Sequence, residues 1–117
     1  MKPLSFIVVE YCSKLDLFSY VAAGYTLGNE PLCHAIFIQI LHSVNFMHQS
    51  KGIAHLDIKL ENIVLDDHYW LKLIDFAYCE PKDTKMSKVK GTERYFAPEV
   101  AQIYYGRKVW HPENLLE

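Results

Sequence analysis

A short polar stretch, HLDIKLEN at positions 55–62, concentrates side chains that could do chemistry. It carries Asp57, Lys59 and Asn62, and a further acid, Asp75, follows between apolar residues in LIDFAYCEP. Carboxylate and carboxamide oxygens are the ligands that a hard cation such as Mg²⁺ takes, together with substrate phosphates. A lysine beside them would neutralise the charge of a phosphoryl group in transfer. The pattern therefore favours phosphoryl transfer.

Apolar periodicity predicts the helices that hold these residues. From Glu30 to His48, apolar residues recur at helical spacing, which predicts the longest helix and the spine of the core, closed by Gly52. Its stripe consists of Ile36, Ile40, Val44 and Met47, widened by Phe37, Leu41 and Phe46. A shorter helix is predicted over residues 16–25, with Ser13 or Asp16 as its cap.

Three short apolar runs predict strands. SFIVV at 5–9 is typical of a buried strand, and the runs at 62–65 and 70–74 flank the polar turn DDHY, which predicts a hairpin. The polar residues of HLDIKLEN then lie between the long helix and the hairpin, and Asp75 follows the second strand. We therefore expect the side chains of Asp57, Lys59, Asn62 and Asp75 to converge at one site. The Lys-rich tract at 79–94 has no periodicity and predicts a long mobile loop of the kind that is often functional.

Composition excludes several classes of protein. The chain has 117 residues, half of them apolar, and a formal net charge of -2, which favours one globular domain and no nucleic-acid partner. Cys12, Cys33 and Cys79 contain no C-x-x-C pair, which argues against a disulfide framework or a zinc ribbon. Neither a membrane span nor a signal peptide is predicted, so we expect a cytoplasmic or nuclear location.

Three motifs together resemble the signature of the protein kinase family. HLDIKLEN resembles the catalytic loop H-R-D-L-x-x-x-N, DFA at 75–77 resembles D-F-G, and APE at 97–99 matches A-P-E, in the family's order and spacing. VVEYCSKLDLFSYV also resembles the kinase hinge and the helix after it, so that the resemblance runs from about Phe6 to Gly106. It implies an α+β, protein-kinase-like fold, mostly the helical large lobe with a remnant strand and the hinge of the small lobe.

The resemblance implies a role for each residue of the polar cluster. Asp57 would orient or accept the proton of a substrate hydroxyl, and Asn62 and Asp75 would hold Mg²⁺ on the phosphates of ATP. Lys59 stands where serine/threonine kinases contact the γ-phosphate. Thr92 would hydrogen-bond both Asp57 and Lys59.

The resemblance also implies contacts to the rest of the nucleotide. Backbone groups of Glu10 and Cys12 would face adenine, Asp16 would lie near the ribose, and Val64 would form the floor under the base.

Other interpretations of single residues stay open. His55 is interpreted as a packed, hydrogen-bonded core histidine beside Phe76, because the bases in this chemistry are carboxylates. Asp16 and Asp57 also suit simple capping of a helix or turn. A metal-dependent phosphohydrolase would use the same acids but would leave the hinge and A-P-E matches as coincidence.

The chain departs from the family pattern at two motif positions. Leu56 replaces the Arg of H-R-D, which in the family pairs with a phosphate on the activation loop, so we expect any activity not to depend on loop phosphorylation. Strong activation by phosphomimetic substitution of Thr84 or Ser87 would contradict this expectation. Ala77 replaces the Gly of D-F-G, and its Cβ costs about 1–2 kcal/mol wherever left-handed backbone is required.

The family's Gly-rich loop, V-A-I-K lysine and partner Glu do not precede Phe6, and the pattern fades after YYGRKVW. We therefore expect a partial kinase domain, truncated at both ends. Residues 1–12 would form the last small-lobe strand and the hinge, 13–106 the large-lobe catalytic segment, and 107–117 a divergent tail. Two functions follow: a serine/threonine kinase acting on protein substrates, with this chain alone inactive, or a pseudokinase-type binding or regulatory module or non-catalytic fragment with a protein partner.

Overall fold

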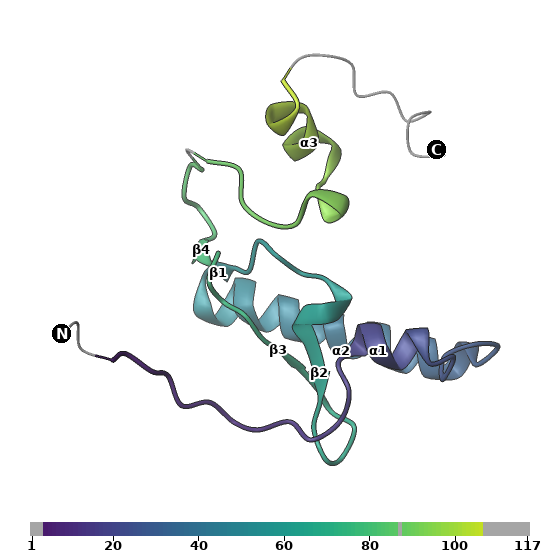
Figure 1. Ribbon diagram of the computed structural model, residues 1–117. Coiled ribbons are helices and arrows are strands. Elements are labelled where there is room, and N and C mark those ends of the chain that lie inside the picture. The colour runs from purple at the N-terminus through teal and green to yellow at the C-terminus, as the bar shows by residue number, and fades with distance from the viewer. Residues whose placement is uncertain (1–3, 87, 107–117) are drawn as a thin grey trace.

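The computed structural model describes residues 4–86 and 88–106 and combines helices with two small antiparallel sheets (Figure 1). The predicted tail 107–117 and the residue Ser87 lie outside the described residues. In chain order the elements are α1 Leu17–Ala22, α2 Glu30–Phe46, the π-helix η1 Met47–Lys51, β1 Ile53–Ala54, the 3₁₀-helix η2 Leu60–Asn62, β2 Ile63–Leu65, β3 Leu71–Leu73, β4 Glu80–Pro81, the 3₁₀-helix η3 Glu93–Tyr95 and α3 Pro98–Tyr104.

Helix α1 begins where a carboxylate caps its first turn. Asp16 accepts hydrogen bonds from the backbone N–H of Ser19 at 2.9 Å and from the Ser19 hydroxyl at 2.7 Å. These bonds lower the pKa of Asp16, and the backbone bond satisfies an N–H that has no partner within the helix. The expected short helix is confirmed over Leu17–Ala22, with Asp16 rather than Ser13 as its cap.

Helix α2 confirms the long helix that periodicity predicts. Asn29 caps it by accepting from the Leu32 N–H at 3.1 Å. The helix continues as one π-turn, η1, and closes at Gly52, where the backbone is left-handed with φ of 64°.

Only one face of α2 is covered, because it lies against β3 of a sheet two strands wide. The covered face carries the expected stripe positions Ile36, Ile40 and Val44, which are half-buried, and the fourth, Met47, is buried at the start of η1. The predicted widening residues Phe37, Leu41 and Phe46 are instead exposed, so this part of the prediction is wrong. Of the predicted spine of the core, residues 30–48, only Met47 is fully buried. The buried apolar residues are Leu17, Met47, Ile63, Leu65 and Ala101.

The predicted hairpin is confirmed as strands β2 and β3. They pair antiparallel with Ile63 opposite Leu73 and Leu65 opposite Leu71. The backbone N–H of Leu71 also receives a partner from α2, the Gln39 side-chain oxygen at 3.1 Å. This bond ties the hairpin to the helix.

The strand predicted at residues 5–9 is absent from the described part of the chain. The segment is irregular, and the side chains of Phe6, Ile7, Val8 and Val9 are 77–89% exposed. An apolar run becomes a strand only when a neighbouring strand takes up its backbone hydrogen bonds. In Figure 1 the purple segment runs beside the domain and not within a sheet.

Part of the tract 79–94, for which the sequence predicts a loop throughout, forms a strand. Strand β4 lies inside it and pairs with β1, with Ala54 opposite Glu80. Glu80 also forms an ion pair with Lys90, which ties the two ends of the tract together.

Among the described residues, no helix is both long and apolar enough to cross a membrane.

Candidate active site

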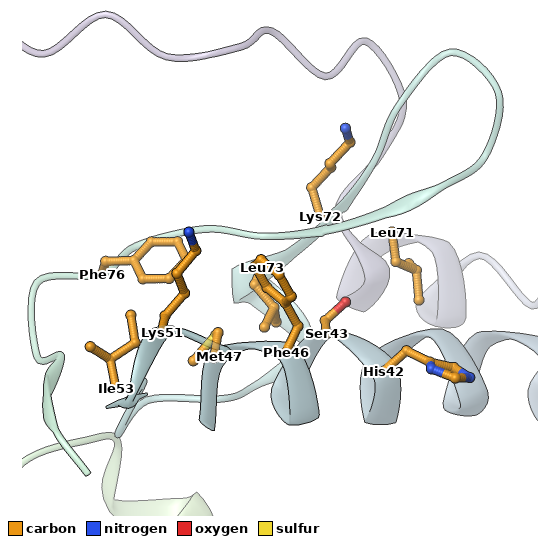
Figure 2. Close-up of a pocket in the computed structure, with 10 residues that line it drawn as sticks. All are labelled: His42, Ser43, Phe46, Met47, Lys51, Ile53, Leu71, Lys72, Leu73 and Phe76. Carbon is orange, nitrogen blue, oxygen red and sulfur yellow. The ribbon is translucent and has the colours of Figure 1, made fainter. Parts of the chain in front are cut away.

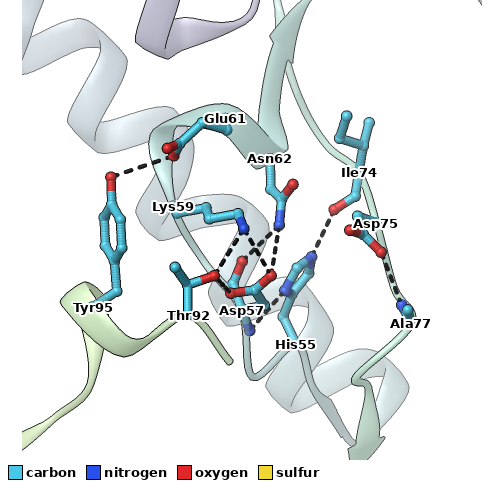
Figure 3. A network of polar contacts seen from close by, with 10 residues as sticks. All are labelled: His55, Asp57, Lys59, Glu61, Asn62, Ile74, Asp75, Ala77, Thr92 and Tyr95. Carbon is cyan, nitrogen blue, oxygen red and sulfur yellow. Dashed lines mark hydrogen bonds and ion pairs between the residues drawn. The ribbon is translucent and has the colours of Figure 1, made fainter. Parts of the chain in front are cut away.

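The segment 55–62 links β1 to β2 and folds back so that its two most polar buried residues meet (Figure 3). Asp57 and Asn62 are each 5% exposed. The Asn62 amide donates to the Asp57 carbonyl at 2.9 Å and to its carboxylate at 3.2 Å. Leu56 makes the reversal possible by adopting left-handed backbone, with φ of 65°.

A residue far along the chain completes the cluster. The Thr92 hydroxyl donates to Asp57 Oδ1 at 2.6 Å, and Lys59 Nζ donates to Thr92 Oγ1 at 2.8 Å. Lys59 Nζ also lies 3.3 Å from Asp57 Oδ2. The structure thus brings together all four residues that the resemblance assigned to catalysis. We call Asp57, Lys59, Asn62 and Thr92 the Asp57 network.

Competing effects act on the Asp57 carboxyl. Burial, the largest single effect, raises its pKa, but hydrogen bonds from Thr92, Lys59 and Asn62 and the positive charge of Lys59 together outweigh burial. The pKa of Asp57 therefore lies below its ordinary value of 3.8. At neutral pH the group is an acceptor-only carboxylate.

We expect the stability conferred by Asp57 to depend on pH. Its folded-state pKa is below the unfolded value near 3.8, so the stabilisation is present above that value and is lost as the pH falls through the folded pKa. Asp57→Asn should lower the free energy of unfolding by about 1–3 kcal/mol at neutral pH and by less at a pH well below 3.8. Urea unfolding of both proteins at the two pH values measures this. An equal difference at both would contradict it, and Asp83→Asn, at an exposed acid, is the matched control.

His55 connects the Asp57 network to the segment that follows β3. It is 1% exposed, its Nδ1 accepts from the Asp57 N–H at 3.2 Å, and its Nε2 lies 2.8 Å from the Ile74 carbonyl oxygen. A proton on Nε2 satisfies both contacts. The ring centroid lies 5.0 Å from that of Phe76. The interpretation of His55 as a packed, hydrogen-bonded core histidine is confirmed.

Asp75 lies outside the Asp57 network, but a backbone hydrogen bond joins its neighbour Ile74 to Asn62 of that network. The Ile74 N–H donates to the Asn62 carbonyl at 2.9 Å, which fixes the start of the DFA segment beside Asn62. Asp75 is exposed, has φ of 58°, and accepts from the Ala77 N–H at 3.3 Å. The left-handed residue of DFA is therefore Asp75, a residue type that tolerates this conformation. Ala77 has no positive φ, so the strain anticipated for it does not arise.

The residues assigned to adenine and ribose fall into two groups. Asp16 and Val64 are paired by an isolated β-bridge, so the start of α1 lies beside the hairpin. Glu10 and Cys12 lie on the irregular segment before α1. The Glu10 carboxylate is 3.1 Å from the ammonium of Lys72 on β3. The carboxylate of Asp16 is already engaged as the helix cap.

The sequence analysis did not identify Gly91, which positions Thr92 beside Asp57. Gly91 has φ of 106°, and a Cβ on it would lie 2.6 Å from the carbonyl oxygen of Leu56. The backbone of the loop at Gly91 thus lies directly against the backbone of the segment 55–62 at Leu56. The glycine at the end of the Lys-rich tract, immediately before Thr92, was the available signal.

A separate hollow lies between α2 and β3 (Figure 2). Its volume is about 490 Å³. Its lining is mainly apolar and includes Phe46, Met47, Leu73 and Phe76, with Lys51 at one end. Through Phe76 it lies next to the His55 ring, but it contains no member of the Asp57 network.

Comparison with known proteins identifies the family. A family model described as the protein kinase domain matches residues 2–110, nearly the whole chain. The chain belongs to the protein kinase family. The kinase assignment confirms the α+β, kinase-like fold and replaces the phosphohydrolase interpretation.

Relatives of this kinase segment are kinases, and two of the three below are named as serine/threonine-protein kinases. It is 40% identical over 100 residues to CBL-interacting serine/threonine-protein kinase 2 of Arabidopsis thaliana, covering 81% of this chain and 21% of the relative. It is 41% identical over 101 residues to the maternal embryonic leucine zipper kinase of Xenopus laevis, covering 83% and 15%. It is 35% identical over 108 residues to serine/threonine-protein kinase chk1 of Schizosaccharomyces pombe, covering 88% and 21%. The chain thus spans only 15–21% of the length of these relatives.

Proposed function

We propose that this chain carries the catalytic segment of a serine/threonine protein kinase, which transfers the γ-phosphoryl group of ATP to a hydroxyl of a protein substrate. The observation that carries the proposal is the Asp57 network, in which one buried carboxylate is held by Lys59, Asn62 and Thr92 at distances of 2.6 to 3.3 Å. Such a network fixes the direction of the carboxylate. Orientation and electrostatics supply most of the catalysis in phosphoryl transfer.

Asp57 would orient the substrate hydroxyl by accepting its hydrogen bond. Because the pKa of Asp57 is lowered, the carboxylate is a weak base and is better suited to aligning the hydroxyl oxygen than to removing its proton early. Lys59 keeps 21% of its side chain exposed, so its ammonium is accessible to an incoming phosphate. Thr92 holds both residues in place. The presence of Lys59 two positions after Asp57 supports a serine or threonine acceptor.

The two residues assigned to Mg²⁺ fit that ion by the chemistry of their donors. Within residues 4–86 and 88–106, Asn62 makes its two side-chain hydrogen bonds through Nδ2, which leaves its carboxamide oxygen available, and Asp75 presents an exposed carboxylate. The described residues contain no cluster of three His, Cys, Asp or Glu side chains suited to a metal. Two oxygen donors completed by phosphates and water are typical of a magnesium site. Mg²⁺ would neutralise charge on the ATP phosphates.

The base and ribose of ATP would lie along residues 10–16. Backbone groups of Glu10 and Cys12 would face adenine, and Asp16 would approach the ribose. Val64, which is bridged to Asp16, would form the floor beneath the base. A cytoplasmic or nuclear location suits this nucleotide supply and the free thiols of Cys12, Cys33 and Cys79.

The second candidate is a kinase-like binding module that does not catalyse transfer. The apolar hollow beside Phe76 favours it, because exposed apolar surface often marks a site of protein–protein interaction. In this second function, the described residues would bind a protein partner but would not phosphorylate it. We expect this chain by itself to be inactive in a phosphoryl-transfer assay with a serine-containing peptide.

Loss of the Asp75 carboxylate is expected to weaken Mg²⁺-dependent nucleotide binding strongly. The experiment is calorimetric titration of the chain with ATP, with Mg²⁺ and with EDTA. Asp75→Asn should weaken the Mg²⁺-dependent affinity by about tenfold or more, because an ionised metal ligand is replaced by a neutral one. The matched control is Asp83→Asn, which removes the same charge at an exposed site.

Each result has a defined meaning. Saturable binding that Asp75→Asn weakens and Asp83→Asn preserves would support the kinase proposal. Binding that is equal in both variants would contradict the assignment of Asp75. No binding by the unmodified chain would favour the binding-module function.

A further inference from the structure

An exposed polar cluster fastens the segment before α1 onto the turn of the β2–β3 hairpin. The Ser13 hydroxyl donates a hydrogen bond to the carboxylate of Asp67, and the backbone N–H of Lys14 donates to the Leu65 carbonyl at 3.3 Å. The Lys14 ammonium also lies 5.3 Å from the centre of the Tyr69 ring. We call these contacts, with those of Lys72 below, the hinge clasp.

Lys72 adds a second set of ionic contacts to the hinge clasp. Its ammonium lies 3.1 Å from Glu10 and 3.8 Å from Asp66, so it joins the segment before α1 to the hairpin turn. Asp66 is itself fixed by the backbone N–H groups of His68 at 2.8 Å and Trp70 at 3.0 Å. The hinge clasp therefore ends on a rigid turn.

We propose that Ser13 is a phosphorylation site, and that its modification weakens the hinge clasp. Ser13 is exposed and lies in a part of the chain without helix or strand, so its hydroxyl is accessible to a modifying enzyme. A separate protein kinase with ATP would supply the group. The bond between Ser13 Oγ and the γ-phosphorus forms, the bond to ADP breaks, and the hydroxyl proton passes to that enzyme's base.

The chemistry of phosphoserine sets the consequence. Its dianion has no proton to donate at neutral pH, so the bond from Ser13 to Asp67 is lost and becomes a repulsion between like charges. This repulsion weakens the hinge clasp where Ser13 meets the hairpin turn.

The consequence for nucleotide rests on the proposed function. The hinge clasp holds the segment of Glu10 and Cys12 beside Val64, the residues assigned to adenine. A weaker hinge clasp holds the two sides of that site together less firmly. ATP affinity is then expected to fall about fivefold, an effect typical of losing one net hydrogen bond.

The primary test measures the clasp without nucleotide. The full chain is prepared with phosphoserine at position 13 and, separately, as Ser13→Glu, and hydrogen exchange of the Lys14 amide is followed by NMR. Exchange is expected to be about fivefold faster than in the unmodified chain. Adding Asp67→Lys to Ser13→Glu should restore the slow exchange, because the new pair is attractive. Ser50→Glu, at an exposed serine in η1, controls for added charge.

The outcomes separate this proposal from the kinase function. Unchanged exchange with phosphoserine at position 13, or no recovery with Asp67→Lys, would overturn the clasp switch. Absence of phosphate on Ser13 by mass spectrometry of the chain expressed in eukaryotic cells would overturn its role as a modification site. Faster exchange with unchanged ATP affinity would support the switch and count against the assignment of residues 10–16 to adenine.

Discussion

Gly91→Ala is expected to detach the loop that carries Thr92 and to lower the free energy of unfolding by about 2–4 kcal/mol. Gly91 has φ of 106°, and an added Cβ would lie 2.6 Å from the backbone oxygen of Leu56. A backbone atom cannot rotate away as a side chain can, so the loop must move. Thr92 would then lose its contacts with Asp57 and Lys59.

Urea unfolding and limited proteolysis measure the two parts of this prediction. The midpoint of unfolding should fall, and cleavage within residues 82–94 should become faster. Gly24→Ala is the matched control, because Gly24 also has a positive φ, 83°, but has open space where the Cβ would be placed. It should cost only about 1 kcal/mol. Equal effects of the two substitutions would show that close approach to Leu56 has no part in the stability of the site.

Leu17→Ala is expected to have the other large effect, a loss of about 2–5 kcal/mol in the free energy of unfolding. Leu17 is 1% exposed and belongs to α1, which packs against η2 and β2. Truncation leaves a cavity in a small core that has few other buried apolar side chains. Because η2 ends at Asn62, the substitution should also loosen the Asp57 network.

The control for Leu17→Ala is the same substitution at an exposed leucine. Leu27→Ala removes the same atoms from a side chain that is 88% exposed, and should change stability by less than about 0.5 kcal/mol. Urea unfolding measures both variants. A small effect of Leu17→Ala on the free energy of unfolding would mean that the packing of α1 contributes little to the stability of the folded chain. The NMR signals of Asn62 would report separately whether the active-site segment has loosened.

The Asp57 network links the stability of this chain to the role proposed for Asp57. The groups that lower the pKa of Asp57 are the same groups that fix its direction. Substitution of Thr92 or Lys59 would therefore change both the protonation of the carboxylate and its orientation. The pH dependence of stability and the binding of Mg²⁺ with ATP are separate measurements of these two properties.

The amino-acid sequence by itself determined the local features of this protein. The long helical run formed by α2 and η1, its end at Gly52 and a helix start near Asp16 follow from periodicity and from hydrogen bonds within one turn. The β2–β3 hairpin follows from two short apolar runs around a polar turn. The kinase motifs likewise lie in short, contiguous stretches. All of these depend on residues close together in the chain, so a pattern in the sequence predicts them.

Tertiary structure alone decided which distant segments meet and which surfaces are covered. Thr92 reaches Asp57, β4 pairs with β1, and the apolar run at 5–9 stays exposed despite its strand-like composition. Gly91 is required only because the loop passes against the Leu56 carbonyl. Such contacts depend on loop closure and on the neighbours available to each surface, which no local periodicity records.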